Sequence, residues 1–480
     1  MRGSPSRALS STTPTTIPQN RAAQEGPRPQ WSTRLRKELG RTLSLALPLV
    51  IAQLLTVGMN VVDTMLSGHL GKDVLSAVTM GFPIWVVAQL VVIGVLLALT
   101  PAVAQRDGAG KRHEVGAIFR QAVWIALGLG VLLAVGLRHA EPLLRLAGVD
   151  EEIVPRSLLF LRAISWGAPA LALLFTCKNT SDGLSKTKPM MFISGLGVLV
   201  LLPVAWILMY GKFGFPRLEA EGAGYAYTVV LWLQALAFLS ILRWHPAYRG
   251  ARLFERFDAP HPATVLRLLS VGVPMGVAIF MEGTLFVVTA LVAGSFGKVA
   301  ASAHGIAINV ASVTFMVPLG VAMATTVRVG NAVGRKDASG VAWSAGAGLS
   351  LAMGAQLVAA VLLFLVPAAI AGLYTEDTAV LGMAIGLIGL AAIFQLSDGA
   401  QVLANGALRG LEDVKIPAVI TIVAYWGVGL PVGLWLGKAQ GRGPSGLWVG
   451  LIVGLSVAGL LLGARFVHQA RRLAREGFDS

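Results

Sequence analysis

The sequence contains one cysteine, Cys177, in 480 residues, and only 13% of its residues are charged. A single cysteine excludes an internal disulfide and a cysteine-based metal cluster. Soluble globular domains carry about 25% charged residues. The low charge, the 55% hydrophobic content and the mean hydropathy of +0.71 therefore exclude an ordinary soluble protein and predict a helical protein that crosses a membrane several times.

Motifs for ATP-driven or hydrolytic chemistry are also missing, so we expect no enzyme. There is no phosphate-binding loop, no HExxH zinc motif and no nucleophile elbow. GRGPSG at 441–446 has the spelling of a dinucleotide fingerprint, but no strand precedes it, so it predicts a turn. The net charge of +15 is what basic membrane loops produce, and we expect no nucleic-acid partner.

Twelve apolar stretches are long enough to cross a bilayer, because about 20 such residues span the hydrocarbon core. Residues 1–33 are instead rich in Ser, Thr, Pro and Arg and predict a disordered tail. The predicted fold is an all-α polytopic membrane protein with twelve transmembrane helices. The stretches are 42–67, 74–105, 116–138, 155–180, 188–211, 219–243, 262–295, 299–331, 340–371, 378–411, 415–438 and 445–468.

The distribution of Lys and Arg predicts the orientation in the membrane. If both tails and the even-numbered loops share one side, that side carries 29 of these residues and the other side carries nine. Basic loops stay in the cytoplasm, so both termini are expected there, in a multi-pass protein of the plasma membrane.

An internal repeat divides the chain into two halves. Pro48 recurs as Pro274, 226 residues later, and the same offset aligns GHLGKDVLSA (68–77) with GSFGKVAASA (294–303). Six helices per copy keep both copies in one orientation, which predicts two bundles related by a pseudo-twofold axis along the membrane normal, with a cavity between them. The expected domains are the bundles 34–243 and 262–470, the cytoplasmic linker 244–261 and the tails 1–33 and 471–480.

Polar side chains form one stripe in the first apolar stretch. Gln53, Thr56, Asn60, Asp63 and Ser67 follow one another at steps of three or four residues, which places them on one helix face. An acid at mid-bilayer costs about 2.5 to 3.5 kcal/mol and normally marks an ion or substrate path. The stripe therefore predicts a cavity wall, with a packing stripe between helices as the alternative.

Two carboxylates, Glu282 and Asp398, lie inside apolar stretches of the second half. Glu282 shares a helix face with Met275, and Asp398 shares one with Gln401 and Asn405. Two nearby acids in a low dielectric cannot both stay ionised cheaply, and a bound cation relieves that cost. The pair predicts competition between a proton, a metal ion and a cationic substrate, with a structural hydrogen-bonded pair as the alternative.

These residues lie in segments that resemble the signature sequences of multidrug and toxic compound extrusion (MATE) transporters of the NorM type. The likeness covers about 40–470. It implies efflux of small organic, often cationic compounds, driven by Na⁺ or H⁺ and without a bound cofactor. The segments are NVVDTMLSGHLG (60–71), PMGVAIFMEGTLF (274–286), FMVPLGVAMATTVRVGNAVG (315–334) and DGAQVLANGALRG (398–410).

The resemblance also implies roles for individual residues. Glu282, Asp398 and Asp63 are the expected cation or proton sites, and Glu282 and Asp398 would bind Na⁺ in a sodium-coupled protein. Leu201 and Ala205 stand where many relatives have asparagines, so we expect coupling chiefly in the second half. The expected lining of the substrate cavity is Gln53, Asn60, Met275, Phe315, Gln401 and Asn405.

Two other functions fit the composition less well. A lipid-linked oligosaccharide flippase of the same superfamily would favour a strongly basic cavity, but the residues inside these stretches are acidic. A polyprenyl-type membrane enzyme would need an Asp-rich metal motif in a sizeable loop, and the loops are short. The sequence does not distinguish Na⁺ from H⁺ coupling, and we expect a monomer in the lipid bilayer.

Overall fold

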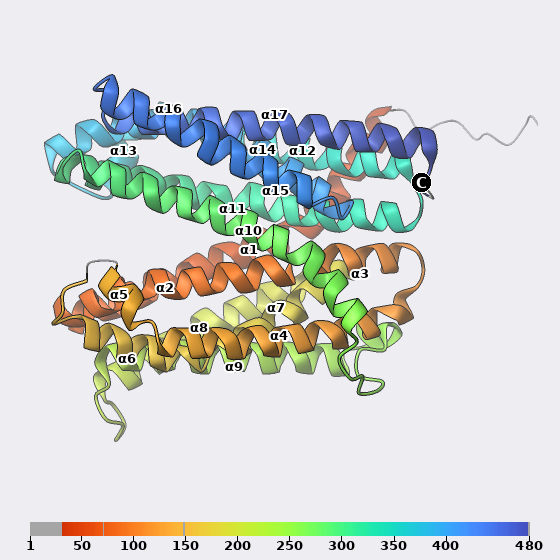
Figure 1. The fold of residues 1–480 in the computed structure, drawn as a ribbon, viewed down its shortest axis with the longest axis horizontal. Coiled ribbons are helices and arrows are strands. Elements are labelled where there is room, and N and C mark those ends of the chain that lie inside the picture. Colours follow the sequence, from red (N-terminus) through yellow and green to blue (C-terminus); the bar gives the residue numbers. More distant parts are fainter. Residues whose placement is uncertain (1–30, 71, 147–148, 479–480) are drawn as a thin grey trace, which may run out of the picture.

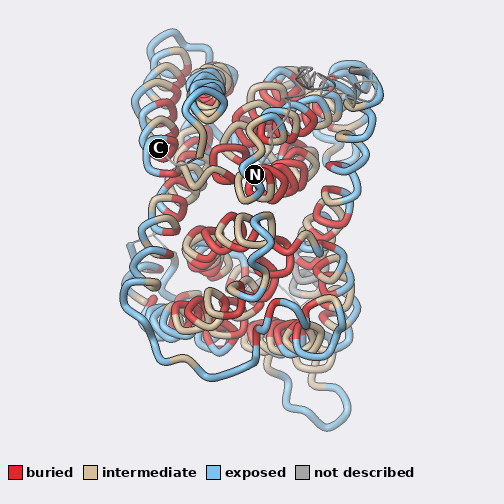
Figure 2. The backbone as a smooth tube through the Cα atoms, turned by 90° about the vertical axis from the view of Figure 1, so that its right-hand side faces the viewer, coloured by how far each residue is buried: buried red, intermediate tan, exposed pale blue. Residues whose placement is uncertain are grey.

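The computed structural model describes residues 31–70, 72–146 and 149–478, and these form helices and short connections without a strand. Of residues 31, 60–65, 67–69, 72 and 73 only the backbone is described. Figure 1 shows the helices in two groups, with the first half of the chain below and the second half above. Viewed from one end, buried residues lie on the facing sides of the helices (Figure 2).

The first half runs from α1 to α9 and the second half from α10 to α17. The helices of the first half are α1 (Trp31–Leu70), α2 (Lys72–Leu96), α3 (Leu99–Gly108), η1 (Arg112–Glu114), α4 (Val115–Arg138), α5 (Glu141–Leu146), α6 (Val154–Ser165), α7 (Ala168–Gly183), α8 (Lys188–Tyr210) and α9 (Glu219–Trp244). After η2 (Pro246–Ala251) follow α10 (Pro262–Gly294), α11 (Lys298–Gly334), α12 (Ala338–Leu365), α13 (Pro367–Gly372), α14 (Thr378–Gly410), α15 (Lys415–Ile422), η3 (Val423–Gly429), α16 (Leu430–Leu434), η4 (Trp435–Ala439) and α17 (Pro444–Glu476).

Within the described ranges, eleven helical segments are long and apolar enough to cross a membrane, and a bent pair makes a twelfth. The pair is α6 and α7, which meet at 46° and cover the fourth predicted stretch. Pro169 is the second residue of α7, and its missing N–H and its ring interrupt helical bonding at the bend. The prediction of an all-α protein with twelve spans is therefore confirmed.

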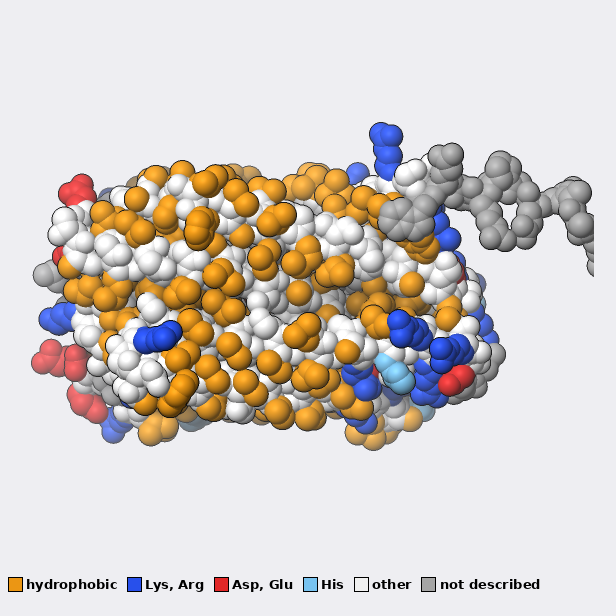
Figure 3. Space-filling view, turned by 90° about the horizontal axis from the view of Figure 1, so that it is seen from above, with side chains coloured by type: hydrophobic (Ala, Val, Ile, Leu, Met, Phe, Trp, Pro, Cys, Tyr) orange, Lys and Arg blue, Asp and Glu red, His pale blue; other side chains and the backbone are white. Residues whose placement is uncertain are grey.

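The surface agrees with a protein that sits in a bilayer. Seen from above, hydrophobic side chains cover the long middle of the molecule, and Lys and Arg gather at the end where α1 begins and α17 ends (Figure 3). We call this end the terminal end. It also carries the loops after α3, α7, α11 and α14, as the alternation of helix directions requires.

Equivalent glycines show that the two halves repeat each other. Gly183 at the end of α7 faces Val103 and the carbonyl of Thr100, and a Cβ there would lie 2.7 Å from the Val103 Cβ. Gly410 at the end of α14 faces Val329 and the carbonyl of Thr326 at the same distances. Backbones pack this closely only where no Cβ intervenes. The pseudo-twofold relation predicted from the sequence therefore extends to the packing of single residues.

The two halves meet at the terminal end, and α1 and α10 each contact both. Midway along α1, Val50 lies against Gly320 of α11, whereas Leu66 near the end of α1 accepts a hydrogen bond (3.2 Å) from Tyr210 of α8. Two further bonds join the halves directly. Gln105 donates to the carbonyl of Gly410 (3.1 Å), and Asn331 donates to the Ser185 hydroxyl (3.0 Å). The described state is therefore closed at the terminal end.

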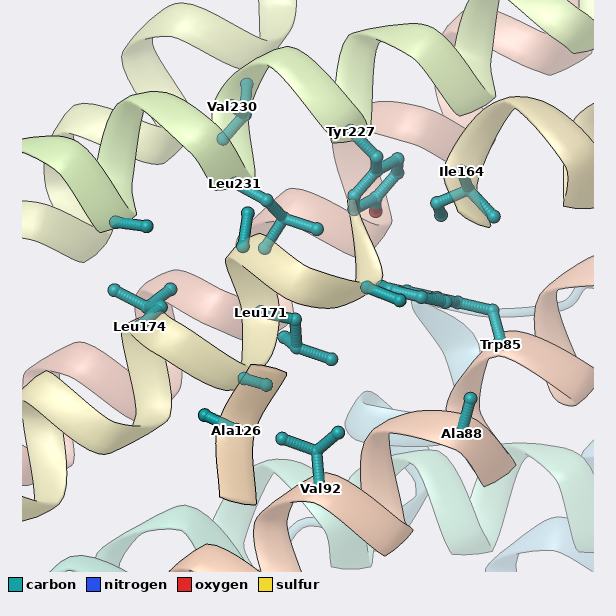
Figure 4. Packing of buried hydrophobic residues seen from close by; sticks show 14 of the residues in the cluster. Trp85, Ala88, Val92, Ala126, Ile164, Leu171, Leu174, Tyr227, Val230 and Leu231 are labelled. Carbon is teal, nitrogen blue, oxygen red and sulfur yellow. The ribbon is translucent and has the colours of Figure 1, made fainter. Parts of the chain in front are cut away.

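Large apolar side chains fill the space between the helices of the first half. Trp85 of α2 is fully buried and lies among Ile164 of α6, Leu171 of α7 and Tyr227 of α9 (Figure 4). Such contacts hold two membrane spans, the bent pair α6–α7 and α9, against α2 by close packing, which drives helix association in lipid.

The linker between the halves is fixed to α4. Gln121 donates to the carbonyl of Ala259 (2.9 Å) and accepts from the backbone N–H of His261 (2.7 Å). Trp124 donates to the carbonyl of Asp258 (2.9 Å), and its ring meets that of Phe257 edge-on. The segment predicted as a linker is therefore held against α4 just before α10 begins.

We expect Gln121→Leu to loosen this connection. The substitution leaves the Ala259 carbonyl and the His261 N–H without their partner, which should lower the free energy of unfolding by about 1 to 3 kcal/mol. Limited proteolysis in detergent should then cut residues 252–261 faster than in the wild type. Gln440→Leu, at an exposed position, is the control. Equal cleavage rates in both variants would contradict the assignment.

Candidate functional site

Two carboxylates of the second half lie close enough to interact. Asp398 stands in α14 and is 3% exposed, while Glu282 stands on α10 and is half-buried. The charge of Glu282 acts on Asp398. Within the described part of the chain, neither carboxylate accepts a hydrogen bond or forms an ion pair. Two acids without such partners at this depth form a place where a proton or a cation is stabilised.

Tyr425 completes this group from a third segment. It lies in η3, a π-helical stretch before Pro431, whose ring nitrogen donates no hydrogen bond. Its side chain is 1% exposed, its hydroxyl has no hydrogen-bond partner among the described residues, and both carboxylates act on it. The neighbouring Trp426 donates to the carbonyl of Met281 (3.1 Å), which ties η3 to α10 beside Glu282.

A network of amides holds α14 in place one turn before Asp398. Gln356 of α12 donates to the Gln395 carbonyl (3.0 Å) and side-chain oxygen (2.7 Å). Gln395 in turn donates to Thr314 and to the carbonyl of Ala311 (3.3 Å) on α11. Because every bond reaches another helix, the network sets the rotation of α14 and thereby the direction of the Asp398 face.

Arg409 is the cation that acts on Glu282. It lies buried near the end of α14, and its Nε has no hydrogen-bond partner within the described ranges. The repeat makes Arg409 the counterpart of Asp182 at an offset of 227. Asp182 is buried and accepts from Lys178 (2.9 Å) inside α7. The halves thus place opposite charges at equivalent positions.

The predicted cavity residues fall into different surroundings. Met275 belongs to a hydrophobic cluster with Leu97 and Val414, and Phe315 packs against the cluster that contains Ala46 and Leu49. The structure thus places both in hydrophobic clusters. Gln401 is buried beside Gly459 of α17, whereas Gln53 and Asn405 are half-buried.

The first-half site rests on side chains that the structure does not describe. Asn60 and Asp63 lie in α1, but their side chains are outside the described residues. Leu201 and Ala205, predicted to stand beside Asp63, are fully buried in the first-half core. Thr289, the counterpart of Asp63 in the repeat, donates to the carbonyl of Leu285 (2.8 Å) in its own helix. The role of Asp63 stays a prediction.

A coupling cation would find oxygen atoms but no ready-made metal cage. Among the described residues, no three His, Cys, Asp or Glu side chains are grouped so that they could hold a metal ion. Tyr425, Gln401 and Gln356 each carry a buried side-chain oxygen without a hydrogen-bond partner in that part of the chain. Carboxylate and neutral oxygens are the ligands of hard cations, so Glu282 and Asp398 together with the Tyr425 hydroxyl suit Na⁺ as well as a proton.

Comparison with known proteins identifies the family. Residues 48–207 and 274–435 match the model of the MatE family. The chain belongs to the MatE family. The second match begins 226 residues after the first, which is the offset of the internal repeat.

Individual relatives resemble this MatE chain over nearly its whole length. The probable multidrug resistance protein NorM of Xanthomonas campestris pv. campestris is 44% identical over 445 residues, 93% of this chain and 97% of the relative. The multidrug resistance protein PmpM of Pseudomonas aeruginosa is 40% identical over 448 residues, 92% and 94% of the two chains. The predicted NorM-type membership is confirmed.

A solved structure shows the same fold. The crystal structure of the eukaryotic MATE transporter AtDTX14 superposes with a TM-score of 0.83 at 20% identity, and the match covers 93% of this chain and all of that one. The match supports the architecture of two bundles related by a pseudo-twofold axis.

Proposed function

We propose that this chain is a secondary active multidrug efflux transporter that exports small organic, often cationic compounds in exchange for Na⁺ or H⁺. The observation that carries the proposal is the pair of carboxylates formed by the buried Asp398 and the half-buried Glu282, which interact with each other and have no hydrogen-bond partner in the described chain. The relatives named as multidrug resistance proteins support the substrate class.

The site explains how export and cation entry are coupled. When Glu282 and Asp398 are ionised and empty, they attract a cationic substrate. Protonation or Na⁺ binding removes that attraction and favours release. Contacts between the halves close the terminal end in the described state. Transport then requires a second state that is open at this end, and binding at the carboxylates shifts the protein between the two states.

The proposal includes the membrane in which the protein works, the side on which its termini lie and its oligomeric state. The basic terminal end faces the cytoplasm, as the excess of Lys and Arg favours, so that both termini lie inside the cell. The protein works as a monomer in the bacterial inner membrane. It binds its substrate without changing it chemically.

Transport in reconstituted vesicles tests the function and identifies the ion. We expect a fluorescent organic cation to move against its gradient when a sodium gradient or a pH gradient is imposed. Whichever of the two gradients drives transport identifies the coupling ion. Transport that needs ATP, or that ignores both gradients, would contradict the proposal.

A further inference from the structure

Two clefts at the terminal end are equivalent by the internal repeat. The linker cleft, of about 1090 Å³, lies between α3, α4, the linker and α10. The α12 cleft, of about 610 Å³, lies between α1, α11 and the start of α12. Equivalent positions line both, as Arg267, Gln105 and Glu412 in the linker cleft correspond to Arg41, Asn331 and Ser185 in the α12 cleft.

In the linker cleft every arginine forms an ion pair with a carboxylate, and only Asp258 is shared by two of them. Its five lining arginines all form ion pairs with its four lining acids. The Arg120 guanidinium also holds the pKa of Asp258 below its ordinary value, so this carboxylate stays charged. The pairs are Arg106–Glu114, Arg120–Asp258 (2.7 Å), Arg252–Glu255 (3.5 Å), Arg256–Asp258 (2.8 Å) and Arg267–Glu412 (3.6 Å).

The α12 cleft has a surplus of positive charge. Four arginines line it with only two acids, Glu38 and Asp337. Glu38 pairs with Arg328 and with Arg41 (3.1 Å), and Asp337 accepts from the backbone N–H of Gly340 (2.7 Å). Arg34 donates to the Ser339 hydroxyl (2.7 Å) and lies over the ring of Trp343 (4.9 Å), and Arg335 is acted on by the more distant Asp107. Neither arginine forms an ion pair with a carboxylate in the described ranges.

One substitution in the repeat accounts for much of this difference. Glu412 neutralises Arg267 in the linker cleft, but the equivalent position in the α12 cleft is Ser185. A serine supplies a hydroxyl and no charge, so the α12 cleft lacks the acid that the linker cleft has. A cavity with unpaired guanidinium groups and neighbouring hydroxyl and amide donors suits an anion with several acceptor oxygens.

We propose that the α12 cleft binds a phosphate-bearing anion. A phospholipid headgroup and a free phosphate share this chemistry. The surroundings fit a lipid, because the cleft lies where the charged start of α1 gives way to its apolar part, and Leu45, one turn after Arg41 on the same helix face, lines it. The bound anion also bridges the halves, since Asn331 and Ser185 line the cleft and bond to each other (3.0 Å). Its binding therefore stabilises the state closed at the terminal end.

Nanodiscs that contain the full chain test the proposal. Phosphatidylglycerol should raise the thermal unfolding midpoint above its value in pure phosphatidylcholine, because a ligand that binds only the folded state stabilises it. Arg41→Gln and Arg335→Gln should each weaken this binding about tenfold, as expected for the loss of one charge-assisted hydrogen bond. Arg267→Gln, the equivalent of Arg41 in the linker cleft, should leave it unchanged.

Two further measurements locate the bound anion and identify whether it is a lipid headgroup or a free phosphate. Hydrogen exchange should show that phosphatidylglycerol protects residues 331–345 in the wild type and not in Arg41→Gln. Stabilisation by inorganic phosphate in phosphatidylcholine discs, with the same dependence on Arg41 and Arg335, would support a soluble phosphate as the ligand. Stabilisation by neither probe, or an equal loss in Arg267→Gln, would overturn the proposal. These experiments measure binding and not transport, so their outcome does not depend on the proposed transport function.

Discussion

Asp398→Asn should abolish ion-coupled efflux while the protein still folds. The amide has the shape of the carboxylate but binds neither a proton nor a cation in its place. One charge that moves through 100 mV supplies about 2.3 kcal/mol, and one pH unit supplies about 1.4 kcal/mol. Together they support a substrate gradient of several hundredfold. We expect the gradient across variant vesicles to fall to the level of empty vesicles.

Glu282→Gln should have the same effect, and the double variant should be no worse than either single variant. The two carboxylates interact, and residues that act on one ion show strongly non-additive effects. Glu376→Gln, which removes an exposed acid of the same half, is the control and should transport normally. Size-exclusion profiles and thermal unfolding confirm that each variant is folded. Full coupling in Asp398→Asn, or additive losses in the double variant, would contradict a shared site.

The sequence predicted the membrane spans because hydrophobicity and helix length decide them. Even the bent pair α6–α7 was visible as one stretch, 155–180, since both parts together match the thickness of a bilayer. The repeat was visible as well, because the two halves keep the same glycines at close contacts. The paths of α1 and α10, which contact both halves, depend on contacts between distant segments, and a pattern along one helix does not contain them.

The candidate site was predicted in part for a similar reason. Glu282 and Asp398 stood out because an acid inside an apolar stretch is costly. The sequence did not point to Tyr425, because the direction of its side chain depends on the π-helical turns of η3. Arg409 and the Lys178–Asp182 pair were missed because they lie near helix ends, where a charged residue suggests a loop. The structure shows all three of these charges buried. Comparison of positions 182 and 409 across the repeat, next to the matching glycines 183 and 410, is the signal that would have found them.

Gly94→Ala should prevent the terminal end from closing, whereas Gly276→Ala should not. Gly94 of α2 and Gly276 of α10 touch where the halves meet. A Cβ on Gly94 would overlap the Cα of Gly276, but a Cβ on Gly276 would lie an ordinary 3.6 Å from the nearest atom of Gly94. Overpacking of this kind costs about 1 to 3 kcal/mol, which shifts a two-state equilibrium roughly 5- to 150-fold away from the closed state.

Thiol labelling measures this shift directly. Ala104 lies on α3 against Gly330 of α11 and is fully buried in the closed state, so a cysteine there should be protected. In a Cys177→Ser background, Ala104→Cys should react with a maleimide much faster when Gly94→Ala is present and at the parent rate with Gly276→Ala. Transport should fall in the first variant only, because the cycle needs both states. Equal labelling in the two glycine variants would show that this contact does not control closure, and the closed end would then depend on the polar contacts of Gln105 and Asn331 instead.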